Sequence, residues 1–177
     1  MGTYMALLRG INVGGRAKVS MSALRDLFVD LGYADAKTYI QSGNVIFSAS
    51  LRSPSKASGE IAARIEKDLG VSCSVLLRSD EELVTVLENN PYLADNVDPS
   101  TLYVAFLDKK PTQEQSKRLV VPPGETAEFT LAGREVYLHY PDGYGRTKLS
   151  NTYIEKRLGV VATTRNWNTV TKLHELA

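Results

Sequence analysis

The pattern of hydrophobic and polar positions divides the start of the chain into a strand-like and a helix-like segment. Residues 4–8 form a short apolar run typical of a buried strand, and residues 21–31 repeat apolar side chains at helical spacing. Ser20 is a favourable N-cap for this helix, and Gly32 is a favourable residue to end it. We therefore expect a strand followed by an amphipathic helix.

Two β-rich runs follow, and the short spacing between them predicts a hairpin. The runs cover residues 38–41 and 44–48 and are separated by Ser42-Gly43. The next expected elements are a helix from the polar entry at 53–55 to Gly70, a strand at 74–78, and a third helix that opens with a Ser79/Glu82 capping box and stops at Asn90-Pro91. The predicted order is βαββαβ with one further helix.

The second half of the chain repeats the first. Residues 103–107 (YVAFL) echo residues 4–8 (YMALL), and a second hairpin is predicted around Gly133. The clearest match is between residues 154–160 and 65–71, which agree in six of seven positions. Chance is a poor explanation for such a match, so we infer an internal duplication.

The duplication predicts the fold class and the domain division. We expect an α+β fold built from two ferredoxin-like βαββαβ subdomains, each followed by a helix. The first subdomain with its helix is expected at residues 1–92, the second at 100–177, and a linker at 93–99.

A glycine-rich loop, RGINVGG at residues 9–15, connects the first strand to the first helix. Glycine allows positive φ and close approach of a ligand to the backbone, and the N-terminus of a helix favours anions. The loop is not a Walker A motif because Arg16 and Ala17 stand where that motif has Lys and Ser/Thr, and it contains no GxGxxG. The matching connection in the second half, residues 108–111, is shorter.

The first loop and the hairpin turn of a βαββαβ unit lie at the same edge of the sheet. Together they are expected to form a site for a phosphate, a carboxylate or a nucleobase. Its predicted residues are Arg9, Gly10, Asn12, Gly14, Gly15, Gln41, Ser42 and Asn44. The alternative for the two asparagines is a structural role in turns, where Asn tolerates positive φ and caps the backbone.

The second half adds a loop, residues 140–148, that has no counterpart in the first half. We expect this loop and the end of the last strand to share an edge and to gather a second polar cluster: Tyr144, Arg146, Lys148, Arg165 and Asn166, beside Trp167. Trp167 fits a core position of the final helix as well as it fits a stacking platform. If the halves are related by a pseudo-two-fold axis, both clusters face one cleft, with Asp142 as the nearby acid.

Composition excludes several other classes of protein. The net charge is +1, from 21 basic and 20 acidic residues, so the chain lacks the overall basic character of a dedicated duplex-DNA binder. Cys73 is the one cysteine, and no apolar run approaches membrane-spanning length. His139 and His174 lack ligand partners at metal-binding spacing, so no metal is assigned. A cytoplasmic protein without membrane contact is expected.

Three motifs resemble those of a known family. They are LRGINVGG at residues 8–15, TYIQSGNVIF at 38–47 and TRNWNTV at 164–170. With these motifs, the chain is similar nearly from end to end to the DUF1697, or SP0830-like, family of uncharacterised bacterial proteins. The resemblance implies a duplicated α+β fold, in agreement with the repeat. It implies no activity, cofactor or catalytic residue.

The motifs leave two classes of function open. The first is binding of an anionic small molecule, such as a nucleotide or a phosphorylated metabolite, in a cleft between the two halves, with or without catalysis on it. The second is a nucleic-acid- or protein-binding module. Against RNA binding, the strands at 4–8 and 44–48 lack the aromatic pattern of RNA-recognition sheets, and the net charge is near zero. The small-molecule interpretation is therefore preferred.

Overall fold

The chain forms two compact units, each built on a four-stranded antiparallel sheet. The structure, a computed structural model, describes residues 1–93 and 96–177. The first unit comprises Met1–Val84 with Leu173–Ala177, and the second comprises Thr85–Lys172. The boundaries of these units fall within the two helices that follow the fourth strand of each sheet, and the subdomains expected at 1–92 and 100–177 stay a prediction. Each of those helices begins in one unit and ends in the other.

The first sheet has the strand order β2-β3-β1-β4. Its strands are β1 (Gly2–Arg9), β2 (Lys37–Tyr39), β3 (Asn44–Ala49) and β4 (Ser74–Ser79). In the central strand, Ala6 faces Val45 on one side and Leu77 on the other. β2 and β3 pair as the predicted hairpin.

The second sheet has the corresponding order β6-β7-β5-β8. Its strands are β5 (Leu102–Leu107), β6 (Glu128–Ala132), β7 (Glu135–His139) and β8 (Ala162–Asn166). In each sheet the first strand of the unit is central and pairs with the third and fourth. Two similar ferredoxin-like halves, and hence the predicted duplicated α+β fold, are confirmed.

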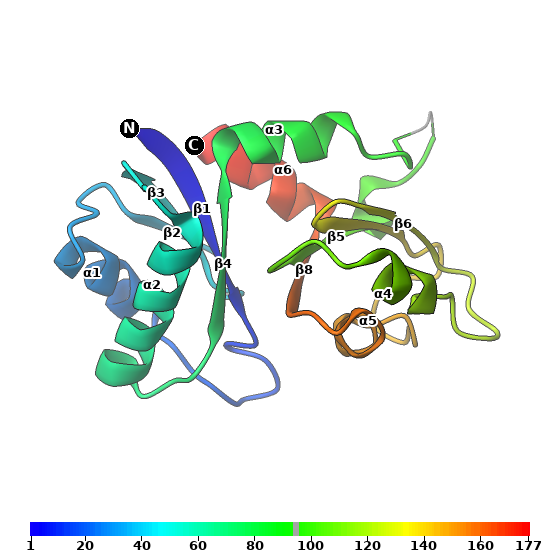
Figure 1. The fold of residues 1–177 in the computed structure, drawn as a ribbon, viewed down its shortest axis with the longest axis horizontal. Helices are drawn as coiled ribbons and strands as arrows, with labels where there is room; N and C mark the ends of the chain where they lie inside the picture. Colours follow the sequence, from blue (N-terminus) through cyan, green and yellow to red (C-terminus); the bar gives the residue numbers. More distant parts are fainter. Residues whose placement is uncertain (94–95) are drawn as a thin grey trace. The chain divides into compact units, whose positions relative to one another are not determined.

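Helices lie against one face of each sheet (Figure 1). The first unit carries α1 (Met21–Asp30) and α2 (Pro54–Leu69), and the second carries α4 (Gln113–Arg118) and α5 (Asn151–Leu158), with a short 3₁₀ turn at Pro99–Thr101. α3 (Asp80–Glu88) and α6 (Trp167–Leu176) follow the fourth strand of each sheet directly. No helix in the described ranges has both the length and the apolar character needed to cross a membrane.

The predicted helix ends agree with the structure because their signals are local. Ser20 caps α1, accepting from the backbone N–H of Ala23, and Gly70 ends α2 at φ 68°. Ser79 and Glu82 form the predicted capping box. The Ser79 N–H donates to the Glu82 carboxylate at 2.9 Å, and the Glu82 N–H donates to the Ser79 hydroxyl at 3.2 Å.

Each unit has a core between its sheet and its helices. In the first, Phe28 of α1 meets Phe47 of β3 edge-on, with ring centroids 5.2 Å apart, and Ile61 and Ile65 of α2 are fully buried. In the second, Ile154 and Leu158 of α5 pack against the side chains of β5 and β7 in the same way. The residues at 61, 65, 154 and 158 are those that the helical periodicity selects.

Candidate functional site

The glycine-rich connection after β1 is a miniature hairpin. The Arg16 N–H donates to the Val13 carbonyl at 3.1 Å, and the Asn12 N–H donates to the Ala17 carbonyl at 3.0 Å. Gly14 and Gly15 form the turn with φ values of 59° and 75°, as a two-residue turn of type I′ requires. We call residues 12–17 the tip hairpin. Its glycines therefore have a structural role in a tight connection.

The side chain of Asn12 fixes the tip hairpin in place. Its amide nitrogen donates to the Val19 carbonyl at 3.0 Å and to the Gln41 carbonyl at 2.9 Å, and its amide oxygen accepts from the Val19 N–H at 2.8 Å. Asn12 also has a φ of 52°, a conformation that Asn tolerates better than most residues. One side chain thus joins the base of the tip hairpin to the turn between β2 and β3.

Further contacts bring the loop after β1 and the β2–β3 turn together. The Leu8 N–H donates to the Gly43 carbonyl at 2.8 Å. A Cβ added to Gly43 would stand 2.5 Å from Cδ1 of the buried Ile11 and 3.0 Å from Cβ of Leu8. The loop after β1 and the β2–β3 turn therefore lie side by side, as their common edge predicts.

Asn44 holds the β2–β3 turn from inside. It is fully buried, and its amide nitrogen donates to the Tyr39 carbonyl and to the Ser42 hydroxyl, each at 2.9 Å. These bonds correspond to the structural alternative for Asn44, while Gln41 next to them is exposed. Direct contact of Gln41, Ser42 or Asn44 with a ligand stays a prediction.

Two cations of the tip hairpin region were missed by the motif analysis. Arg16 and Lys18 are both exposed, whereas Arg9 at the end of β1 is half-buried. Residues 9–25 contain neither Asp nor Glu, which is the sequence signal that selects them. The exposed positive charge of this edge therefore comes from Arg16 and Lys18 rather than from Arg9.

The Tyr140–Lys148 loop of the second unit is anchored by aromatic contacts. Tyr144 stacks on Tyr103 of β5 with centroids 5.0 Å apart and meets Tyr140 edge-on at 5.3 Å. The Tyr140 hydroxyl donates to the Leu149 carbonyl at 2.7 Å, and burial raises the pKa of this phenol. Tyr144 thus belongs to the packing of this loop.

Glu125 adds a carboxylate beside the predicted cations of this loop. It accepts from the Lys148 N–H at 2.8 Å and from the Thr147 hydroxyl at 2.8 Å, and these bonds hold the pKa of Glu125 below its ordinary value. The expectation that Asp142 is the only acid near Arg146 and Lys148 is wrong, because Glu125 lies beside Lys148. The side chains of Arg146 and Lys148 are exposed.

Arg165 does not join Tyr144. It pairs with Val104 across β8 and β5, whereas Tyr103, on which Tyr144 stacks, pairs with Asn166. Because successive residues of a strand point to opposite faces, Arg165 lies on the face of the sheet away from Tyr144. The Arg165 guanidinium donates to the Thr163 hydroxyl at 2.7 Å, and burial lowers its pKa to about 10.

Asn166 and Trp167 have structural roles where β8 meets α6. The Asn166 side chain accepts from the Thr169 N–H at 2.8 Å, as an N-cap does, and the Trp167 side chain is buried. The core alternative for Trp167 is therefore the one that the structure supports. Contact of Arg165 or Asn166 with a ligand, and a cleft shared by the two clusters, stay predictions.

Other reactive side chains have ordinary surroundings. Cys73 packs beside the first core, and burial, with a smaller effect of Glu66, raises the pKa of its thiol to about 11. A thiol with this pKa is protonated at neutral pH and is a poor nucleophile. Among the described residues, no three His, Cys, Asp or Glu side chains lie close enough to hold a metal ion.

These features define a duplicated α+β protein whose loops, rather than whose cores, differ between the halves. The chain belongs to the family described as "Protein of unknown function (DUF1697)", which it matches over residues 1–137. Its fold is similar to that of the conserved bacterial protein SP0830 from Streptococcus pneumoniae. The TM-score is 0.74 at 24% sequence identity, over 99% of this chain and 98% of that one. No curated protein matches the chain.

We predict that Gly43→Ala destabilises the first unit. The φ of 81° disfavours any side chain, and the new methyl group would collide with Ile11 and Leu8. The free energy of unfolding should fall by about 2–4 kcal/mol in urea titrations. Gly59→Ala is the control, because Gly59 lies in α2 with open space around it, and this change should raise stability by roughly 0.5–1 kcal/mol. Equal effects of the two changes would contradict the packing argument.

We also predict that the hydrogen bonds of Asn12, rather than its backbone conformation alone, hold the tip hairpin. Asn12→Ala should lower the free energy of unfolding by about 1–3 kcal/mol, because three bonds are lost. Asn12→Gly removes the same bonds while relieving the positive φ. If Asn12→Gly were as stable as the original protein, backbone strain and not hydrogen bonding would be the role of this position.

Proposed function

We propose that this protein binds a small anionic molecule, such as a nucleotide or a phosphorylated metabolite, at the tip hairpin and the adjoining β2–β3 turn. The observation that carries the proposal is the triple hydrogen bonding of Asn12, which joins these two loops beside the exposed Arg16 and Lys18. A site held in this way loses little freedom when a ligand binds. We place this binding in the cytoplasm, where such molecules are abundant.

The backbone of the tip hairpin is open to a ligand. Apart from each glycine and its two neighbours in the chain, no heavy atom lies within 4 Å of the place where a Cβ of Gly10, Gly14 or Gly15 would stand. A phosphate or carboxylate group can therefore approach the main chain while Arg16 and Lys18 supply positive charge. Arg16 can form two parallel hydrogen bonds to such a group, which Lys18 cannot.

The same surface supports binding rather than catalysis. Residues 9–19 and 40–44 contain no His, Cys, Asp or Glu. The side chains that most often act as general bases are therefore missing from these two segments, and Ser42 is their one hydroxyl. We propose a binding role for this edge.

A nucleic-acid- or protein-binding module is the second candidate, and one observation favours it. Val13 of the tip hairpin is 67% exposed and Ile40 of the β2–β3 turn is 46% exposed, and each is next to a residue of the Asn12–Gln41 bond. Exposed apolar side chains beside cations are typical of surfaces that meet a macromolecule.

We predict that the double change Arg16→Gln/Lys18→Gln abolishes ligand-induced stabilisation. A screen of nucleotides and phosphosugars by thermal shift should find a compound that stabilises the original chain, by roughly 2.7 kcal/mol at 100 times its dissociation constant. Lys56→Gln/Lys67→Gln is the matched control, since both lysines are exposed on α2 of the same unit. This control should respond like the original chain. Stabilisation that survives the loss of Arg16 and Lys18 would exclude the tip hairpin as the site.

Two further measurements complete the experiment: one on the Arg9→Ala variant and one with single-stranded RNA as the ligand. If Arg9 contacts the ligand, Arg9→Ala should lose the ligand effect and remain folded, whereas unfolding without ligand would assign Arg9 a structural role. A single-stranded RNA oligonucleotide that stabilises the chain where every small anion fails would favour the second candidate.

A further inference from the structure

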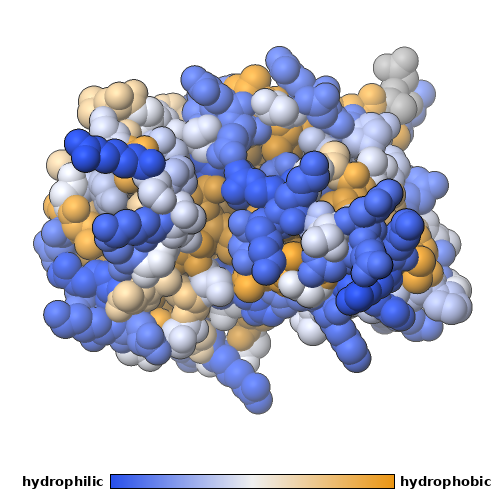
Figure 2. Space-filling model, viewed as in Figure 1, coloured by the Kyte–Doolittle hydropathy of each residue, from blue (hydrophilic) through white to orange (hydrophobic). Residues whose placement is uncertain are grey.

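A cationic pocket lies between α4 and α5 of the second unit. It has a volume of about 300 Å³ and is lined by Arg118, Tyr153, Lys156 and Arg157. Figure 2 shows hydrophilic side chains gathered over the part of the second unit where these two helices lie. Lys156 and Arg157 lie in the repeated segment 154–160, but no sequence motif marked any of the four lining residues as part of a site.

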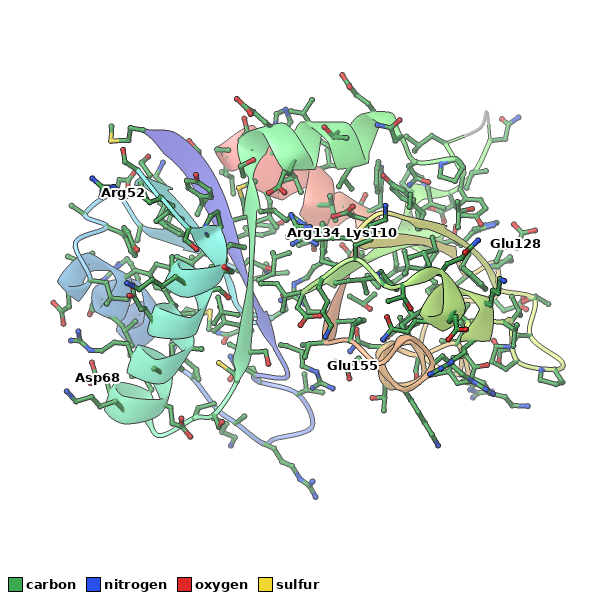
Figure 3. All side chains as sticks on the ribbon, viewed as in Figure 1. Arg52, Asp68, Lys110, Glu128, Arg134 and Glu155 are labelled. Carbon is green, nitrogen blue, oxygen red and sulfur yellow. The ribbon has the colours of Figure 1, made fainter. Side chains whose placement is uncertain are left out.

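Comparison of the two repeats shows which sequence differences make this pocket positively charged. α5 corresponds to α2, so Tyr153 stands at the position of Arg64, and Arg157 stands at the position of Asp68. In α2, Arg64 donates to Asp68 and the two charges cancel; Figure 3 labels Asp68 near the end of that helix. In α5, the Arg157 guanidinium carbon lies 5.1 Å from the centroid of the Tyr153 ring. The ion pair of one copy is thus a cation on an aromatic ring in the other.

The second helix that lines the pocket, α4, is also more basic at its end than its counterpart in the first unit. α4 occupies the place of α1, between the first and second strands of its unit. The last turn of α1 contains no basic residue, whereas that of α4 ends in Lys117 and Arg118. The Tyr153 hydroxyl donates to the Val120 carbonyl at 2.9 Å, which ties α5 to the segment that follows α4. The two walls are therefore fixed to each other.

Compensation of helix dipoles is the simpler explanation for basic residues at these helix ends. The first unit shows that this fold does not require basic residues at the ends of these helices. α1 ends without a basic residue, and in the last turn of α2 Lys67 is followed by the acidic Asp68. Dipole compensation also gives no reason for the cations of two helices to line one pocket.

Among the described residues, no carboxylate is paired with the cations of this pocket, Arg118, Lys156 and Arg157. Glu155, labelled in Figure 3, accepts from the backbone N–H of Ala162 at 2.9 Å and so is directed toward β8. Glu114 lies one turn before Arg118 on α4, at the spacing at which side chains are neighbours, but among the described residues it forms no ion pair with Arg118.

We propose that the α4–α5 pocket binds a small molecule that carries a diphosphate group. Two guanidinium groups can each bind phosphate oxygens in pairs, and Lys156 adds a point charge. The volume of about 300 Å³ is at the lower end for small-molecule sites, which fits a diphosphate and a small substituent. A nucleic-acid backbone makes roughly 6–10 phosphate contacts with proteins that bind it tightly, and this pocket offers fewer. The site is distinct from the one proposed at the tip hairpin.

Inorganic pyrophosphate is the probe, and isothermal titration of the full chain at low salt is the measurement. The experiment uses the Arg16→Gln/Lys18→Gln background, so that the tip hairpin contributes no cations and failure of one site does not imply failure of the other. We expect saturable binding of one pyrophosphate per chain. Arg157→Gln and Arg118→Gln should each raise the dissociation constant about tenfold, because each removes a charge-assisted contact.

Lys156→Gln and Lys67→Gln form the matched pair, because they are corresponding exposed lysines of α5 and α2. Lys156→Gln should weaken binding and Lys67→Gln should not. Amide signals of residues 118 and 153–157 should shift in a ¹⁵N-edited NMR titration. No saturable binding up to about 10 mM, or equal weakening by the two lysine changes, would overturn the proposal. Tighter binding of single-stranded RNA than of pyrophosphate or ADP, lost with the same arginines, would also overturn it.

Discussion

The exposed edge of the first unit depends on the amide group of Asn12. A loop with two consecutive glycines has high conformational entropy, and a type I′ turn alone stabilises it weakly. The Asn12 side chain offsets this entropy because it bonds both to Val19, where the chain returns toward α1, and to Gln41 in the neighbouring turn. Asn12 also adopts the positive φ at the first residue of the tip hairpin. Together with the backbone hydrogen bonds of the tip hairpin, this side chain holds the segment that carries Arg16 and Lys18.

The two units show what the duplication kept and what it changed. Strand order, register around the central strand and the left-handed glycines that end α2 and α5 are the same in both. The connections differ: a hairpin leads into α1 in one copy, whereas a capping box opens α4 directly in the other. Packing constrains the strands and inner helix faces, because a change there leaves a cavity or a clash. Exposed loops and helix ends are less constrained by packing, so they are where new chemistry can arise.

The sequence predicted the parts of this structure that rest on local signals. The strands, the Ser20 cap, the Ser79/Glu82 box and the duplication follow from periodicity and short motifs. The side of the sheet on which Arg165 lies did not follow, because it depends on a pairing with Val104 that no local pattern encodes. The α4–α5 pocket was missed for a related reason. The single mismatch in the repeat, Asp68 against Arg157, was visible, but its meaning depends on Tyr153 one turn earlier and on Arg118 from a different helix.

A net charge near zero does not argue against anion binding by this protein. Interactions between exposed charges are screened beyond about 8–10 Å at ordinary ionic strength, so a ligand responds to the charges nearest to it rather than to the total of +1. Acidic residues of this chain are used where they stabilise the fold. Asp80, Glu81 and Glu82 open α3, where the helix dipole favours them, and Asp68 pairs with Arg64 along α2. In the sequence, these acidic residues lie away from the tip hairpin and from the ends of α4 and α5. The chain can therefore have local positive surfaces and still have a net charge near zero.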